Sequence, residues 1–307
     1  MKHCATAFAP ASVGNVGVGF DLIGHVIDGP GDTVTATLSD QPGVVIEAIE
    51  GIVTGLPLDV ERNTAGRAVQ SLLQAQNADF GIRLLIRKGI PLGSGLGGSA
   101  ASATAALVAV NALLSKPLAL EQLYPHALAG ESVASGSAHG DNVGPQLIGG
   151  LVLATLDRLV AIPVPDNLHA VVVHPDHIVE TRAARASLAK PFPIDTIVAQ
   201  NAHLAKFLCG CYTNDLGLIA AGLNDVLVEP RRATLIPGFA EVKKAALDQG
   251  ALGASISGAG PSIFGWFTSP DQARSAGQAM IDAFAKAGLE AKCWVSPVSS
   301  PGARLVE

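Results

Sequence analysis

The sequence predicts a mixed fold, α+β or α/β, in two lobes. Strand and helix patterns are interleaved along the whole chain, as they are in these classes. The 307 residues correspond to about two domains, at roughly 100 to 200 residues each. Apolar residues make up 49% of the chain and charged residues 15%, which provides material for a large core and excludes intrinsic disorder.

The first half of the chain begins with short strands and continues with helices. Residues 33–38 alternate Thr-Val-Thr-Ala-Thr-Leu, the period of a half-buried strand, whereas residues 63–76 carry apolar side chains at helical spacing. An Ala-rich helix over 99–114 is ended by Lys116-Pro117. The elements predicted in this half are strands over 33–38, 44–49 and 82–86, helices over 63–76, 99–114 and 120–131, and a loop over 135–145.

The second half repeats this mixture of strands and helices. Its predicted strands cover 170–173, 254–257, 263–267 and 290–295, and its predicted helices cover 195–207, 215–226, 238–248 and 270–287. The break near residues 163–167 is the best candidate for a boundary, because its prolines and polar residues interrupt both patterns. We therefore expect an N-terminal lobe of residues 1–165 and a C-terminal lobe of residues 166–307.

The charge balance excludes several classes of partner. The chain has 20 Lys and Arg against 26 Asp and Glu, and neither half is strongly basic, so we expect no binding of nucleic acid or of anionic membranes. The longest apolar stretch, residues 100–114, is short for a membrane span and contains Ser102, Thr104 and Asn111. The N-terminus has no signal-peptide pattern. We expect a soluble, cytoplasmic protein.

The cysteines indicate neither a disulfide scaffold nor a zinc site. Four cysteines in 307 residues are too few for a disulfide framework. Cys209 and Cys211 are two residues apart, but Cys4 and Cys293 lie near the chain ends without histidines at zinc spacing. We expect four ordinary buried thiols.

The sharpest local signal is a glycine-rich loop between a strand and the long Ala-rich helix. Its sequence is Pro-Leu-Gly-Ser-Gly-Leu-Gly-Gly-Ser-Ala-Ala-Ser over residues 91–102. Glycines let the backbone approach a ligand closely, and a helix N-terminus offers N–H groups and a positive dipole end to a phosphate. Ser99 is predicted to be the N-cap, with a hydroxyl that could also reach a metal ion. The predicted nucleotide-binding residues are Pro91, Leu92, Gly93, Ser94, Gly95, Leu96, Gly97, Gly98, Ser99, Ala100 and Ala101.

Other phosphate motifs fit this loop less well. Gly93, Gly95 and Gly98 satisfy the dinucleotide pattern G-x-G-x-x-G, but a helix pattern surrounds Glu121, where that fold needs a second strand. The Walker A pattern fails, because no Gly-Lys-Ser/Thr follows. A plain turn would not need four glycines before a long helix.

The glycine loop resembles that of the GHMP kinases, a family named after galactokinase, homoserine kinase, mevalonate kinase and phosphomevalonate kinase. The shared pattern is Pro-x3-Gly-Leu-Gly-x-Ser-Ala-Ala. Residues 9–21, Ala-Pro-Ala-Ser-Val-Gly-Asn-Val-Gly-Val-Gly-Phe-Asp, resemble the family's N-terminal substrate motif. Residues 257–262, Ser-Gly-Ala-Gly-Pro-Ser, resemble its C-terminal glycine motif. The three motifs occur in family order and extend over nearly the whole chain.

Within the family, the chain looks most like the homoserine kinase branch. The form Asn-x-Gly-x-Gly-Phe-Asp is typical of that branch, as are residues 135–143, Thr181-x3-Arg185 and residues 229–239. The resemblance implies an α+β, two-lobed fold with a ribosomal-S5-like N-terminal lobe and a ferredoxin-like C-terminal lobe. It also implies a left-handed βαβ crossover, against the usual rule. The chain departs from relatives at Gly98, where many have Ser, and at His25, where most have an aliphatic residue.

The same resemblance implies the reaction and its cofactors. The activity would be ATP-dependent phosphorylation of L-homoserine to O-phospho-L-homoserine in threonine biosynthesis, with Mg²⁺ held by the Ser99 hydroxyl and the Glu131 carboxylate. Asn63, at the start of a predicted helix, would help to bind adenosine. Relatives are often dimers, so a homodimer is expected without any support from the sequence itself.

Homoserine is a zwitterion, so its site needs both charges. The guanidinium groups of Arg185 and Arg232 suit the α-carboxylate, because a guanidinium binds a carboxylate through two hydrogen bonds. The predicted substrate-binding residues are Asn15, Asp21, His139, Arg185, Arg232 and Gly258. Their neighbours Arg182 and Arg231 are expected to be exposed charges.

The general base is left open by the sequence. Mevalonate-type relatives place an Asp about seven residues before a Gly-Gly pair, and this count reaches Asn142 here. An amide accepts no proton, so catalysis is expected to rely on positioning and electrostatics, with the γ-phosphate as proton acceptor. If the count is off by one, Asp141 becomes the base. Asn142 and Asp141 are therefore the predicted catalytic residues.

Two other functions fit the same family features. One is a GHMP kinase for a different small alcohol, although mevalonate would leave Asp21 without an amine to bind. The other is a catalytically silent sensor of ATP and a metabolite, which would not need Ser99 and Glu131 as metal ligands.

Overall fold

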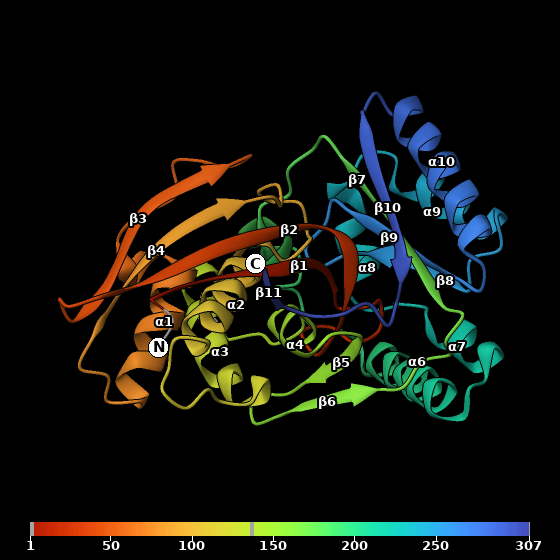
Figure 1. Cartoon of the computed structure of the whole chain (residues 1–307). Helices are drawn as coiled ribbons and strands as arrows, with labels where there is room; N and C mark the ends of the chain where they lie inside the picture. The colour runs from red at the N-terminus through yellow and green to blue at the C-terminus, as the bar shows by residue number, and fades with distance from the viewer. Residues whose placement is uncertain (1–2, 136–137, 307) are drawn as a thin grey trace.

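A computed structural model of the chain describes residues 3–135 and 138–306, and these residues form two lobes around two β-sheets (Figure 1). The first sheet has seven strands and the second has four. This arrangement confirms the predicted two-lobed α+β class. Most of the predicted elements are present, and most of their ends are shifted by a few residues.

The first sheet has the strand order β11-β1-β2-β4-β3, and β5 pairs with both β2 and β6. It is antiparallel except for the parallel pair β3 and β4, which α1 connects. The strands of this sheet are β1 (Cys4–Gly14), β2 (Ile23–Ser39), β3 (Gly43–Gly51), β4 (Gly81–Lys88), β5 (Leu151–Ala154), β6 (Leu159–Ile162) and β11 (Arg304–Val306).

β2 is much longer than the strand predicted over 33–38. Its 17 residues pair with β1 along most of their length, and the register shifts between Pro10 and Ser12. The predicted alternation is correct where it was recognised, since Val34 and Ala36 are buried between less buried threonines. The Gly-Pro-Gly segment at residues 29–31, a turn signal in the sequence, lies inside this strand.

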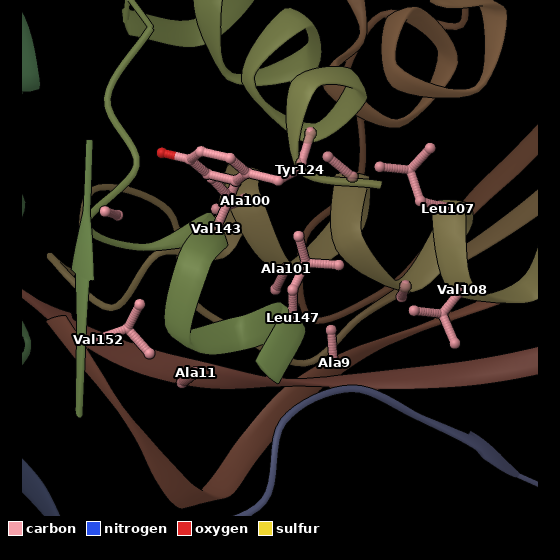
Figure 2. Packing of buried hydrophobic residues seen from close by; sticks show 14 of the residues in the cluster. Ala9, Ala11, Ala100, Ala101, Leu107, Val108, Tyr124, Val143, Leu147 and Val152 are labelled. Carbon is pink, nitrogen blue, oxygen red and sulfur yellow. The ribbon is translucent and has the colours of Figure 1, made fainter. Parts of the chain in front are cut away.

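The helices α1 (Thr64–Ala75), α2 (Gly98–Asn111) and α4 (Val143–Ile148) pack on this sheet, and α3 (Tyr124–Ser135) packs on these helices. α2 is buried on all sides from Ala100 to Asn111. Its small side chains explain this placement, because neighbouring backbones can approach closely around them. Figure 2 shows Val143 and Leu147 of α4 pointing toward Ala100 and Ala101 of α2 and the alanines of β1.

The second sheet is antiparallel, in the order β10-β7-β9-β8. Together with α9 and α10 it forms the βαββαβ arrangement of a ferredoxin-like lobe. Its elements are β7 (His169–Pro175), α9 (Phe239–Asp248), β8 (Gly253–Ile256), β9 (Ile263–Phe267), α10 (Pro270–Lys286) and β10 (Ala291–Pro297). α9 and α10 pack on this sheet (Figure 1), while Phe264 and Trp266 of β9 belong to the core of the first lobe.

The helices between β7 and α9 connect the lobes. They are α5 (Thr181–Ala186), α6 (Ile194–Thr213), α7 (Leu216–Gly222) and α8 (Glu229–Arg232). Phe207 of α6 and Ile219 of α7 are buried in the core of the first lobe. Asp225, after α7, accepts backbone hydrogen bonds from residues 227, 228 and 229, and so fixes the start of α8.

Several further parts of the chain differ from the sequence prediction. The loop predicted over 135–145 is shorter, because α4 already begins at Val143. The helix predicted over 120–131 is a 3-10 turn, Leu120–Leu123, followed by α3. The short elements β5, β6, β11, α5 and α8 carry too few residues for a recognisable period. β11 pairs with β1, so residues 304–306 lie in the first sheet although the predicted lobe of 166–307 includes them.

His25 forms a hydrogen bond between the lobes. Its Nδ1 lies 2.8 Å from the Val26 carbonyl oxygen, which can only accept, so Nδ1 carries the proton. Nε2 then accepts from the indole N–H of Trp266 at 3.2 Å. Burial lowers the pKa of His25 to about 4, which keeps the ring neutral. His25, where most relatives have an aliphatic residue, therefore connects β2 to β9.

All four cysteines are free, as expected, but they are not all buried. Cys4 and Cys209 are exposed, Cys293 is partly buried and Cys211 is buried. The expectation of four buried thiols is wrong for the first two. In the described part of the chain, no helix combines the length and the apolar character that crossing a bilayer requires.

Candidate active site

A cleft between the lobes is bordered by the glycine loop and by charged side chains. It is lined by residues 90–99 together with residues 15, 21, 88, 131, 139, 141, 142, 179, 181, 185, 232 and 258–260. Nearly every residue predicted to bind ligand is among them, although they come from distant parts of the sequence. The cleft therefore joins the three motifs that the sequence analysis recognised.

The glycine loop reaches its shape through residues with positive φ. Gly93, Gly95 and Gly97 have φ values of 60°, 73° and 68°. At Gly95 an added Cβ would lie 2.3 Å from the carbonyl oxygen of Ser257, so only glycine allows the loop to pass this close to the C-terminal motif. Three of the glycines are therefore required by conformation.

Ser99 is not the N-cap that the sequence predicts. α2 begins at Gly98, and its N-cap is Gly97 in a left-handed conformation without a capping side chain. A glycine there turns the chain unaided, so the hydroxyl of Ser99 is available for another contact. It donates to Glu131 Oε2 at 3.0 Å.

Hydrogen bonds to its carbonyl oxygens hold the loop in place. The Ser257 hydroxyl donates to the Gly95 oxygen at 2.7 Å, and the Ser262 hydroxyl to the Ser94 oxygen at 2.6 Å. The backbone N–H of Ser12 donates to the Leu96 oxygen at 3.1 Å. A phosphate needs N–H donors, so these contacts fix the loop without using any of the groups that would bind the ligand.

Lys88 is a cleft residue that the sequence analysis missed. Its ammonium group is paired with Asp32 and also donates to the Gly98 oxygen at 2.6 Å and to the Ser102 hydroxyl at 2.8 Å. Asp32 accepts further from Ser102 Oγ and from the N–H groups of Gly89 and Ile90. Through Gly98 and Ser102, this network stabilises the first turn of α2. The alternation of β4 could have revealed the burial of Lys88, because Lys88 lies on the same buried face of the strand as Ile86 and Leu84.

Ser99 and Glu131 are suited to hold a magnesium ion. Both side chains present hard oxygen atoms beside the N-terminus of α2, where the phosphates of a nucleotide would lie. Burial raises the pKa of Glu131 to about 8, although the Ser99 hydroxyl opposes this shift. A cation here would restore the charged carboxylate. Two protein oxygens suffice for an ion that binds mainly phosphate and water.

Asp21, Arg185 and His139 form a charged cluster opposite the loop. Both terminal nitrogens of Arg185 donate to the Asp21 carboxylate, at 3.0 and 3.1 Å. Arg185 Nη2 lies 3.1 Å from His139 Nε2, which must therefore accept, and His139 Nδ1 lies 3.4 Å from Asp21. Burial lowers the pKa of His139, which agrees with a neutral ring. The structure places these three residues, which the sequence analysis predicted to bind substrate, in contact with one another.

Arg232 and Arg185 share the ring of Phe20. Their guanidinium carbons lie 5.1 and 5.5 Å from its centroid. Arg232 Nη1 donates to the Gly258 oxygen at 2.9 Å. The Nε atoms of both arginines are buried and have no hydrogen-bond partner among the described residues. Phe20, which the sequence analysis quoted only as part of a motif, thus aligns two cations along one side of the cleft.

Asn15 organises the cluster rather than facing a ligand freely. It adopts a φ of 70°, its Nδ2 donates to the Gly258 oxygen at 2.8 Å, and its Oδ1 accepts the N–H of Asp21. Asp21 also has a positive φ, of 59°. Left-handed conformations at non-glycine residues cost free energy, and they concentrate at functional sites.

Asp141 and Asn142 lie side by side at the floor of the cleft. Asp141 is 4% exposed and accepts the N–H of Asn15 at 3.2 Å. Burial, and secondarily the charge of Asp21, raises the pKa of Asp141 to about 7. Asn142 Oδ1 accepts from the Ser12 hydroxyl at 2.9 Å.

Three residues predicted to bind nucleotide do not line the cleft. Ala100 and Ala101 are fully buried within α2, one turn below the loop. Asn63 caps α1 by accepting from the N–H groups of residues 65 and 66, and its amide donates to the Pro57 oxygen. Gly136 and Ser137, part of the motif over 135–143, lie outside the described residues.

The two arginines expected to be exposed charges differ from each other. Arg182 is exposed, as predicted. Arg231 is partly buried, and its guanidinium stacks 3.4 Å from the Phe192 ring. It donates to the carbonyl oxygens of residues 188, 190 and 191. The prediction is therefore wrong for Arg231, which secures the chain that follows α5.

Comparison with known proteins agrees with this geometry. Residues 63–150 match the N-terminal domain of the GHMP kinases, and residues 205–286 match their C-terminal domain. Homoserine kinase of Xanthomonas campestris pv. campestris is 58% identical, over 98% of this chain and 94% of that protein. Homoserine kinase of Chlorobaculum tepidum is 43% identical, over 98% of each chain.

A solved structure is similar over the full length. The crystal structure of homoserine kinase from Cytophaga hutchinsonii superposes with a TM-score of 0.96 at 44% identity, covering 100% of this chain and 98% of that one. Its similarity covers both lobes and all segments that line the cleft. The chain therefore belongs to the GHMP kinase family, and within it to the homoserine kinases.

Proposed function

We propose that the chain transfers the γ-phosphoryl group of ATP to the side-chain hydroxyl of L-homoserine, forming O-phospho-L-homoserine for threonine biosynthesis. The observation that carries the proposal is the arrangement of the cleft. A glycine loop at a helix N-terminus faces a cluster that combines the carboxylate of Asp21 with the guanidinium groups of Arg185 and Arg232. The homoserine kinase relatives, similar over nearly their full length, support the same reaction.

The glycine loop would bind the phosphates of ATP. Backbone N–H groups of residues 93–99 and the positive end of α2 favour the negative charge there. Ser99 and Glu131 would hold Mg²⁺, which would neutralise charge on the phosphates when it is bound. Asn63 remains our candidate for the adenosine end, where it would act through the start of α1 that it caps.

The charged cluster would bind the amino-acid part of the substrate. Arg232 and Arg185 both line the cleft, and their guanidinium groups can donate to the α-carboxylate. Asp21 can accept from the ammonium group if Arg185 turns from it toward the carboxylate. Gly258 allows the backbone to pass close to this site at a φ of 54°.

The chemistry would depend on positioning and electrostatics. Asn142 cannot accept a proton, so the hydroxyl proton would pass to the γ-phosphate, as expected for a loose transition state. Asp141 is the alternative base, and its pKa of about 7 would suit that task. Its carboxylate is however held by the N–H of Asn15, which favours a role in shaping the substrate site.

A coupled assay of ADP release tests the proposed reaction. The chain would be supplied with ATP and Mg²⁺ and, separately, with L-homoserine, mevalonate, galactose or L-threonine. We expect turnover on L-homoserine alone. Turnover on mevalonate would preserve the nucleotide site and discard the amino-acid site, and ATP binding without any turnover would favour a sensor. Light scattering of the same sample would test the expected homodimer, and cell fractionation the cytoplasmic location.

A further inference from the structure

The orientation of the Asn142 amide follows from a chain of hydrogen bonds beneath the cleft. Gln146 Nε2 lies 3.0 Å from the carbonyl oxygen of Gly97 and 3.0 Å from Ser12 Oγ. Ser12 Oγ lies 2.9 Å from the Asn142 amide. Three side chains from β1, α4 and the residue before α4 thus connect the glycine loop to the floor of the cleft.

The direction of the first bond is determined by an unambiguous acceptor, and the other two bonds agree with it. The Gly97 carbonyl has no proton, so the Gln146 atom facing it must be the NH₂ group. That NH₂ group also donates to Ser12 Oγ, whose single proton stays available for Asn142, and in the structure the hydroxyl donates it to the amide. The atom of Asn142 that receives it is therefore Oδ1, which leaves Nδ2 as the donor of that amide.

Nδ2 of Asn142 has no hydrogen bond to any described residue, and Asn142 lines the cleft beside Asp141. Ser12 and Gln146 are fully buried, so bulk water does not reach their contacts. The N–H of Ser12 and the side chain of Gln146 also hold successive carbonyl groups of the loop, those of Leu96 and Gly97. One relay thus fixes both the loop and the amide.

We propose that Ser12 and Gln146 are positioning residues, which hold Asn142 with its NH₂ group toward the reacting oxygens. Asn142 then donates a hydrogen bond either to the attacking hydroxyl or to a γ-phosphoryl oxygen, and never accepts the substrate proton. The inference rests on the proposed function, because those oxygens exist only if the cleft binds ATP and an alcohol. It adds two residues that line no part of the cleft.

Ser12→Ala removes the bridge without touching the ligand. We expect kcat for L-homoserine to fall about 10- to 100-fold, as misplaced catalytic groups do, while KM for ATP and for L-homoserine changes less than about 3-fold. Gln146→Met, which leaves the Ser12 proton without its enforced direction, should give a smaller decrease of the same kind. Ser296→Ala is the matched control, because Ser296 is also buried on a strand and its hydroxyl has no partner among the described residues.

A double-mutant cycle separates positioning from loss of fold. In an Asn142→Ala background, Ser12→Ala should have no further effect on kcat, because the amide that it orients is absent. Independent effects of the two substitutions, or unchanged kcat in both Ser12→Ala and Gln146→Met, would overturn the inference. Absence of turnover in the unchanged chain would instead contradict the proposed function.

A spectroscopic measurement tests the inference even if the unchanged chain shows no turnover. In an ¹⁵N–¹H spectrum, the side-chain NH₂ signals of Asn142 should move in Ser12→Ala and stay in place in Ser296→Ala. If Ser12→Ala leaves these signals unchanged, the hydroxyl does not hold the amide and the inference fails. Thermal unfolding of each variant shows that the comparison is made between folded proteins.

Discussion

Two ion pairs border the same cleft and differ in almost every respect. Lys88 and Asp32 have 3% and 0% exposed side chains, and Asp32 accepts from Lys88, from Ser102 and from two backbone N–H groups. Arg185 and Asp21 have 39% and 22% exposed side chains, and Arg185 keeps an Nε without a partner in the described residues. The charged groups of the first pair are buried and make their hydrogen bonds within the protein, whereas the second pair is accessible from the cleft.

The difference indicates two roles for charge in one site. A buried pair whose hydrogen bonds are all made cannot change partners without a large loss of free energy, so Lys88 and Asp32 are suited to support α2 and the glycine loop. A half-exposed pair stabilises the fold little and can exchange a partner for a ligand. Arg185 and Asp21 are therefore suited to receive the two charges of an amino acid.

The largest effect is expected from breaking the buried pair. Asp32→Asn leaves the Lys88 ammonium buried without its counter-charge, which should lower the free energy of unfolding by about 3–5 kcal/mol. Chemical denaturation measures this loss. Glu50→Gln is the control, because its pair with Arg87 is exposed and should change stability by less than about 1 kcal/mol. Equal losses of unfolding free energy in the two variants would show that the buried pair stabilises the fold no more than an exposed pair does.

The open pair is expected to affect the substrate and not the fold. Arg185→Lys keeps the charge and loses the paired hydrogen bonds, so kcat/KM for L-homoserine should fall about 10- to 100-fold, as a hydrogen bond to a charged group is worth roughly 1.5–3 kcal/mol. KM for ATP should stay unchanged, and the unfolding midpoint should move little. The exposed Arg182→Lys on the same helix provides the comparison. A stability loss as large as that of Asp32→Asn would contradict the assignment.

A substitution at Asp141 tests whether this carboxylate binds the substrate or acts as a general base. Asp141→Asn should raise KM for L-homoserine about 10-fold, the effect of a group left without its hydrogen bond, and lower kcat less. Steady-state kinetics at saturating ATP separates the two constants. A collapse of kcat at unchanged KM would make Asp141 the general base and would end the account of catalysis by positioning alone.

The smallest effect concerns the polar contact between the lobes. Because burial holds the pKa of His25 near 4 in the folded chain, the unfolded chain takes up a proton first as the pH falls below about 6.5. Stability should therefore rise with pH in this range, and His25 should contribute a loss of about 1 kcal/mol between pH 7 and 5.5.

His25→Gln is the matched variant for this loss. The glutamine side chain can still accept from Trp266 but does not titrate. Denaturation at both pH values should show a shallower dependence in the variant. An identical dependence in both proteins would show that His25 is not the group responsible.

Much of this arrangement could be predicted from the sequence where a local pattern sets a local structure. The alternation of β2 and the glycines before α2 are such cases, since strand period and positive φ depend on neighbouring residues. The family resemblance added the charged residues, because Asp21 and Arg185 are 164 positions apart and no periodicity connects them.

The remaining features depend on contacts that no local pattern contains. The sequence suggests Ser99 as the N-cap of α2, but the N-cap is Gly97 in a left-handed conformation, which no local pattern indicates. Arg231 resembles a surface charge until Phe192 and three carbonyl groups surround it. Ser12 and Gln146 are uncharged polar residues in apolar segments, and only the hydrogen bonds that connect them to Asn142 give them a role.

In the proposed enzyme, one wall of the cleft binds ATP and the other binds both charges of the amino acid. The most direct measurement compares kcat/KM for L-homoserine, for 4-hydroxybutyrate, which lacks the amine, and for 3-aminopropan-1-ol, which lacks the carboxylate. Each analogue leaves a charged group of the site without its partner, so we expect both to lose about 100-fold or more at unchanged KM for ATP. Comparable turnover of either analogue would show that the cleft does not bind that charge of the substrate.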